Sequence, residues 1–263
     1  MNILLHELRA YRKSTIIWTV SLIAITALFM SFYPSFEKES EGFRNILEGY
    51  PAAFRDALGI NLDTFFSVLG LYSYGLTYIT MCGAIQAMNI GASIVSKETR
   101  EKTADFLLTK PVTRTTILTS KLLAALISIL ITNGIYLAAS TLVMNQVKSA
   151  DFNSKIFILL SLTLLLIQLV FLAIGIIISV LVPKIKSVLT VSLGTVFGFY
   201  FLGIFSAGDE VKRYISPFKY FETTYIMENS GYEASFLIAG AIIIILAITA
   251  SYMVYIKKDI HSV

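Results

Sequence analysis

Long apolar segments alternate with short polar ones along the whole chain. A helix needs about 20 apolar residues to cross the roughly 30 Å hydrocarbon core of a bilayer, and six segments of the chain reach that length. The pattern therefore predicts an all-α integral membrane protein in which residues 1–263 form a single transmembrane domain. The six transmembrane helices are expected at about 15–32, 66–95, 122–147, 156–182, 188–205 and 236–256.

Two of the polar segments are long enough to carry structure of their own. Residues 33–63 contain two stripes of apolar side chains at helical spacing, which predict two short helices on the membrane surface. Residues 207–235 are rich in Tyr and Phe, which favour the headgroup level of a bilayer. We expect the first loop to be a structural lid over the spans, with substrate gating as the alternative, and the second to be an aromatic belt.

The composition agrees with a membrane protein. Hydrophobic residues make up 56% of the chain and charged residues only 14%, whereas soluble domains average about 25% charged residues. The basic residues flank the apolar spans instead of forming one stripe, so the pattern does not indicate nucleic-acid binding. The single cysteine, Cys82, excludes an intramolecular disulfide and any cluster of cysteine ligands for a metal.

Charge predicts which side of the membrane each loop faces. Six spans place both termini on one side, together with residues 96–121 and 183–187. That side would carry 13 Lys and Arg residues against 5 Asp and Glu residues, and the other side 8 against 12. Because Lys and Arg resist translocation, we expect the N and C termini in the cytoplasm and the loops 33–63 and 207–235 outside.

The middle of the spans lacks ionisable residues, which weighs against two classes of membrane protein. Carriers coupled to ions or protons usually keep Asp, Glu, Lys, Arg or His at mid-membrane, and none lies there in the expected spans. The two histidines, His6 and His261, lie in the terminal tails, so no Ser–His or Cys–His pair can form inside the spans. We expect neither a secondary transporter nor an enzyme.

Four amide side chains lie within the expected spans. An amide in hydrocarbon needs a hydrogen-bonding partner, so we expect bonds between helices, with lining of a polar pathway as the alternative. Gly194 and Gly198 form a GxxxG pair, which permits close approach of another helix but is a weak signal. The amide residues are Gln86, Asn89, Asn133 and Gln168.

The charged segment 96–121 is expected to face water or a soluble partner, because six Lys and Arg residues fall in it. Thr103 can cap a short helix that Pro111 ends, which predicts about two helical turns over residues 103–110. Such a helix is too short to persist alone in water. Its apolar stripe favours docking in a groove of another protein, although a connector that packs on its own membrane domain remains open. The stripe consists of Ala104, Leu107 and Leu108, with Phe106 beside it.

The same segment resembles the inner loop of ATP-binding-cassette (ABC) transporter permeases of the second exporter class. It has the pattern E-x-R-E-x-T-x-x-x-L-L-x-x-P-V-[ST]-R, followed by a Lys at the next span. The outer segments YPAAFRDALGIN and ISPFKYF look like those of the bacterial small-permease branch. One departure is Lys102, where many members of the family have Gly. The matching residues are Glu98, Arg100, Glu101, Thr103, Leu107, Leu108, Pro111, Val112, Thr113, Arg114 and Lys121.

This resemblance implies that residues 96–121 hold a coupling helix that seats on an ATPase subunit. The chain itself lacks the GxxxxGK[ST] phosphate-binding motif, so it is expected to bind no cofactor, with ATP and Mg²⁺ held by the partner. The resemblance further implies two ATPase copies and a second membrane permease, which is a copy of this chain or a relative. The docking residues are expected to be Glu98, Arg100, Glu101, Thr103, Phe106, Leu107, Leu108, Pro111 and Arg114.

The residues and the resemblance together predict a function. We expect the permease subunit of an ATP-driven exporter in a bacterial plasma membrane. The main alternative is a non-transporting membrane partner of an ABC ATPase, such as a sensor or an immunity factor. A secondary transporter is a weaker alternative.

Overall fold

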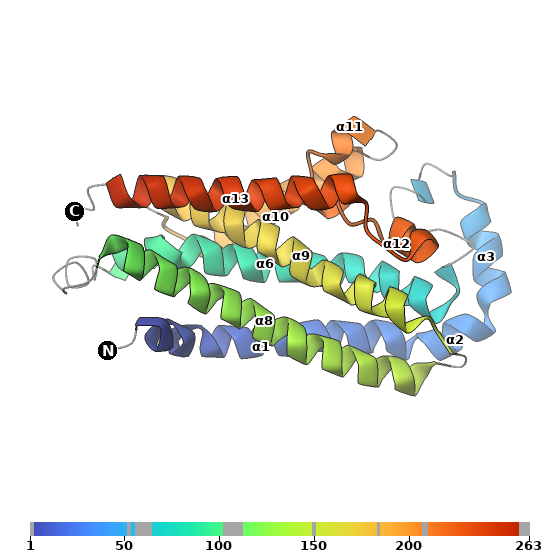
Figure 1. Cartoon of the computed structure of the whole chain (residues 1–263). Helices are drawn as coiled ribbons and strands as arrows, with labels where there is room; N and C mark the ends of the chain where they lie inside the picture. The colour runs from blue at the N-terminus through green and yellow to red at the C-terminus, as the bar shows by residue number, and fades with distance from the viewer. Residues whose placement is uncertain are drawn as a thin grey trace.

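The structure, a computed structural model, describes residues 3–51, 54–55, 65–101, 113–148, 151–182, 185–206 and 210–257. Every regular element within these ranges is a helix (Figure 1). Six of them, α1, α6, α8, α9, α10 and α13, are long and apolar enough to cross a membrane, which confirms the predicted fold class. In chain order the helices are α1 (Ile3–Ser31), α2 (Tyr33–Lys38), α3 (Ser40–Glu48), α6 (Val68–Glu101), α8 (Arg114–Val147), α9 (Ser154–Leu181), α10 (Val188–Phe205), α11 (Glu210–Arg213), the 3₁₀ helix η1 (Pro217–Lys219), α12 (Thr223–Asn229) and α13 (Ala234–Lys257).

Polar side chains set the starts of several long helices. Thr113 accepts a hydrogen bond from the backbone N–H of Thr116 and begins α8. Asn153 and Ser187 cap α9 and α10 in the same way, because a side-chain oxygen there satisfies a free N–H of the first turn. α1 starts at Ile3, earlier than the expected span, since the basic segment before residue 15 contains no helix breaker.

The long helices lie side by side, and both chain ends are found at one end of the bundle (Figure 1). α3 and α12 lie at the opposite end (Figure 1). α3 covers the first of the two surface helices expected in the loop 33–63, whereas most of the second falls outside the described residues. α12 was not expected, because its sequence TTYIMEN has no clear apolar stripe.

Glycine allows a close crossing between α6 and α9. A Cβ atom placed on Gly91 would lie 2.5 Å from the carbonyl oxygen of Leu172, and one on Gly175 would lie 2.8 Å from that of Met88. Only glycine fits at such distances, so the two backbones touch directly here. By contrast, a Cβ atom on Gly194 or Gly198 of α10 would meet nothing within 4 Å. The expected GxxxG pair therefore faces away from the rest of the described chain.

The half-buried Arg213 holds the loop before α13 in place. Arg213 forms a hydrogen bond and ion pair of 2.6 Å with Glu233, donates to the carbonyl oxygen of Lys219, and stacks over the ring of Phe236 at 4.2 Å. The hydroxyl of Tyr220 donates to the carbonyl of Tyr214, and burial raises the pKa of Tyr220. Charge pairing, as well as the expected aromatic side chains, thus holds this end of the bundle together.

Candidate functional site

The expected docking residues that the structure describes lie at the end of the bundle that carries the chain termini. Glu98, Arg100 and Glu101 lie in the last turns of α6, and Arg114 is the first residue of α8. The remaining expected docking residues lie outside the described residues; they are Thr103, Phe106, Leu107, Leu108 and Pro111. Their role in docking, and the short helix at 103–110, therefore stay predictions.

Lys121 joins the two helices that flank this segment. Its Nζ atom donates a 2.6 Å hydrogen bond from α8 to the carbonyl oxygen of Ile94 on α6. The residue is only 2% exposed, so the expectation that Lys121 faces water or a soluble partner is wrong. A flexible four-carbon side chain can carry an ammonium group some distance from its own helix, and the sequence could not show that it turns inward onto α6.

Two further hydrogen bonds tie α8 to α13. The guanidinium of Arg114 donates to the carbonyl oxygen of Ile256 at 3.3 Å, and the hydroxyls of Thr119 and Tyr252 are 2.7 Å apart. Together with Lys121, these contacts hold the ends of α6, α8 and α13 in one assembly. We call Arg114, Thr119 and Lys121 the clasp residues. Only Arg114 and Lys121 stood out in the sequence, because a threonine beside a span is too common to carry a signal.

Three of the four amides form a network near the middle of the bundle. Gln168 on α9 donates to Gln86 on α6 at 3.1 Å, and Gln86 donates to Thr132 on α8 at 3.0 Å. The amide nitrogen of Asn133 on α8 donates a hydrogen bond to the side-chain oxygen of Gln168. The hydroxyl of Thr19 on α1 donates to the hydroxyl of Thr132. The bonds join four spans, as expected for amides in hydrocarbon.

The fourth amide, Asn89, lies apart from this network. It is half-buried, and no hydrogen-bonding partner is found for it among the residues that the structure describes. Gln86 and Gln168 are fully buried. Asn89 shares its half-buried position with Asn133, but unlike Asn133 it has no partner among the described side chains. The lining role stays a prediction for all four amides.

A second polar layer was missed by the sequence analysis. The hydroxyl of Tyr72 on α6 lies 3.0 Å from that of Tyr136 on α8 and 2.8 Å from that of Ser161 on α9, and Thr26 on α1 donates to Tyr136. Tyr72 and Tyr136 are almost fully buried. The same four spans thus meet at two polar layers. Hydroxyl residues are frequent in every span, so nothing in the sequence marks these four as partners.

The described residues contain few candidates for metal binding or for a reactive group. No group of three His, Cys, Asp or Glu side chains gathers into a metal-binding arrangement within the described ranges. Cys82 is a free, half-buried thiol on α6. What the structure does show are hydrogen bonds between helices, made by the clasp residues and the two polar layers.

A family model described as "ABC-2 family transporter protein" matches residues 1–260. The chain belongs to the ABC-2 transporter family. It is a multi-pass membrane protein and the permease component of an ABC transporter, and the ABC-2 membrane component is distinct from the ATPase. Membership in the ABC-2 family implies an ABC ATPase as partner. Among curated proteins, none matches this chain.

Proposed function

We propose that this ABC-2 permease subunit couples ATP hydrolysis on a separate ATPase to export across the plasma membrane. The ATPase supplies the sites for ATP and Mg²⁺. The observation that carries the proposal is the position of the clasp residues, which tie α6, α8 and α13 together at the two helix ends that flank residues 102–112. A force applied to that segment reaches three spans at once.

The proposed orientation places both termini in the cytoplasm. The end of the bundle that carries the termini also carries Glu98–Glu101 and Arg114 (Figure 1), and the surplus of Lys and Arg supports a cytoplasmic position for it. A cytoplasmic ATPase then meets residues 102–112 directly. When the ATPase pair closes, the segment moves, and the clasp residues carry the motion into the spans.

The open face of α10 supports a second permease chain. A side chain at Gly194 or Gly198 would meet nothing in the described part of this chain, so another helix can approach closely there. Phe197 and Phe201 are exposed on the same helix. In the proposed assembly, two permeases, identical or related, meet two ATPases, and the transport path runs between the membrane domains.

The proposal is tested by breaking the expected contact with the ATPase. Leu107→Asp places a charge in the apolar stripe, and because burying one Leu is worth about 1.5–3 kcal/mol, we expect about tenfold weaker binding of the ATPase or more. ATPase co-purification and ATP-dependent transport by the complex in vesicles are the measurements. Ile46→Asp on α3, exposed at the other end of the bundle, is the matched control and should leave both unchanged. Normal assembly and transport with Leu107→Asp would contradict the proposal.

A further inference from the structure

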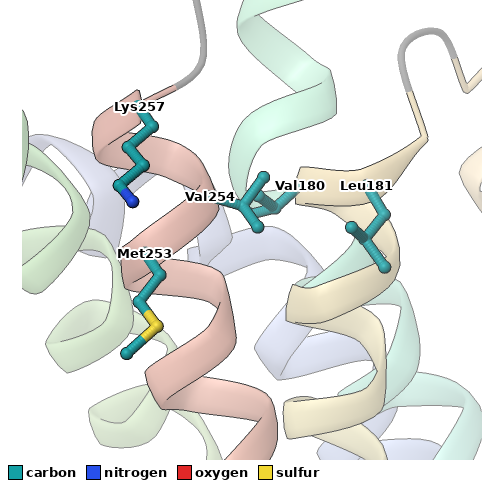
Figure 2. A pocket seen from close by; sticks show the side chains of 5 residues that line it. All are labelled: Val180, Leu181, Met253, Val254 and Lys257. Atoms are coloured by element: carbon teal, nitrogen blue, oxygen red, sulfur yellow. The ribbon is translucent and has the colours of Figure 1, made fainter.

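A groove lies between the last turns of α9 and α13, at the end of the bundle that carries the termini. It has a volume of about 460 Å³ and is lined by Val180, Leu181, Met253, Val254 and Lys257. Figure 2 shows Val180 and Val254 pointing toward one another between the two helices, with Met253 and Lys257 one turn apart on α13. Four of the five lining side chains are apolar. The groove is within the size range of small-molecule sites.

The single cation of the groove borders its apolar surface. Figure 2 shows the Lys257 side chain extending back along α13 toward Met253. Within the described ranges no carboxylate pairs with Lys257. The guanidinium of Arg114 lies near the same turn, because it donates to the carbonyl oxygen of Ile256. The end of this groove is therefore positively charged, while its walls are hydrocarbon.

The position of the groove within the membrane indicates which kind of molecule can fill it. α9 and α13 both end here, at Leu181 and Lys257, and both are spans, so the groove lies where the hydrocarbon core meets the headgroups. Leu181 and Met253 are 57% and 61% exposed, so their side chains face the acyl chains of the bilayer. A molecule that fills this groove needs an alkyl chain and, at its membrane-surface end, an anion.

We propose that the groove is a binding site for one anionic phospholipid, with an acyl chain against the exposed side chains of Leu181 and Met253 and its phosphate beside the ammonium of Lys257. Basic pockets between spans are a known mode of recognition for anionic headgroups. A lysine in the last turn of a helix also stabilises the helix dipole, but that role does not need an apolar groove beside it. Arg114, an expected docking residue, lies next to this groove, but the lipid site does not rest on the proposed ATPase contact.

Native mass spectrometry of the purified chain tests the proposal. The chain is reconstituted in nanodiscs of phosphatidylcholine alone and of phosphatidylcholine with phosphatidylglycerol, then released and scored for bound lipid. We expect one phosphatidylglycerol to be retained in preference to phosphatidylcholine, and Lys257→Gln to lower that preference about fivefold, the factor that corresponds to one basic residue near a membrane surface. Met253→Trp, which fills the groove at an exposed position, should reduce retention of both lipids.

Lys13→Gln is the matched control, because Lys13 is exposed on α1 at the same end of the bundle and does not line the groove. The preference for phosphatidylglycerol should survive this change. Equal loss with Lys13→Gln and Lys257→Gln would overturn the proposal, since it would indicate general surface charge. Two other results would also overturn it: displacement of the lipid by inorganic phosphate alone, or a rise in lipid retention when residues 258–263 are removed, which would make the chain's own C-terminal segment the occupant.

Discussion

At the scale of single residues, the buried amides show what a sequence can and cannot reveal. That Gln86, Asn133 and Gln168 would find partners was predictable, because an unpaired amide in hydrocarbon is costly. Which partners they find was not predictable, since this depends on the crossing of α6, α8 and α9. Lys121 makes the same point, because its inward turn onto Ile94 depends on the distance between two helices.

The amide network gives a prediction about stability. Gln168→Leu removes the partner of both Gln86 and Asn133 and should lower the free energy of unfolding by about 1–3 kcal/mol, the usual cost of leaving buried polar groups unpaired. The midpoint of unfolding in denaturing detergent is the measurement. Asn89→Leu is the control and should change stability little. A larger loss with Asn89→Leu than with Gln168→Leu would contradict this account.

At the scale of helices, direct backbone contact organises the bundle. The sequence drew attention to Gly194 and Gly198, which lie on one helix at a familiar spacing. The contact is made instead by Gly91 and Gly175, one on each of two helices, and no spacing along the chain can identify such a pair. The helices themselves were predictable from the apolar segments, whereas α12, a short helix held by its surroundings, was not.

The crossing of α6 and α9 predicts that replacing different glycines with leucine has different effects on stability. Gly91→Leu and Gly175→Leu should force the helices apart and destabilise the protein by at least about 1–3 kcal/mol, the cost of overpacking. Gly194→Leu, on an open face, should be tolerated by the single chain. Size-exclusion chromatography of the detergent-solubilised variants after heating measures the folded fraction. Equal tolerance of all three would show that the crossing is looser than described.

The ion pair of Arg213 is expected to contribute more to stability than the exposed ion pair of Arg44. Arg213→Met breaks a pair in which the side chains are 14% and 20% exposed, and the loss of a largely buried partner should cost about 2 kcal/mol. Arg44→Met breaks a helix-surface pair with side chains 49% and 51% exposed, which should cost only about 0.3–0.5 kcal/mol. Thermal unfolding of both variants compares them. A smaller effect for Arg213→Met would contradict the fastening role assigned to it.

At the scale of the whole molecule, both chain ends lie at one end of the bundle, opposite α3 and α12 (Figure 1). This arrangement was predictable from six spans, because an even number returns the chain to its starting side. The surplus of Lys and Arg at this end then supports the proposal that it faces the cytoplasm. The proposed docking segment falls largely outside the described residues, so its position relative to a partner stays a prediction.

The orientation predicts the outcome of labelling from one side of the membrane. In a Cys82→Ala background, single cysteines at Ser40 and Asn229, near α3 and α12, should react with a membrane-impermeant maleimide in intact cells. A cysteine at Lys13 or Lys257 should react only after the membrane is opened. Reaction of all four in intact cells, or the reverse pattern, would overturn the proposed cytoplasmic termini.

The glycine crossing has a mechanical consequence. At 1.5 Å per residue, α6 extends about 15 Å from Gly91 to Glu101 and about 35 Å from Gly91 to Val68. A stiff rod held at Gly91 is a lever with unequal arms. In the proposed orientation, a shift of about 1 Å at the end next to residues 102–112 becomes a shift of about 2 Å at the far surface, so a small movement on the proposed cytoplasmic side is enlarged on the opposite side.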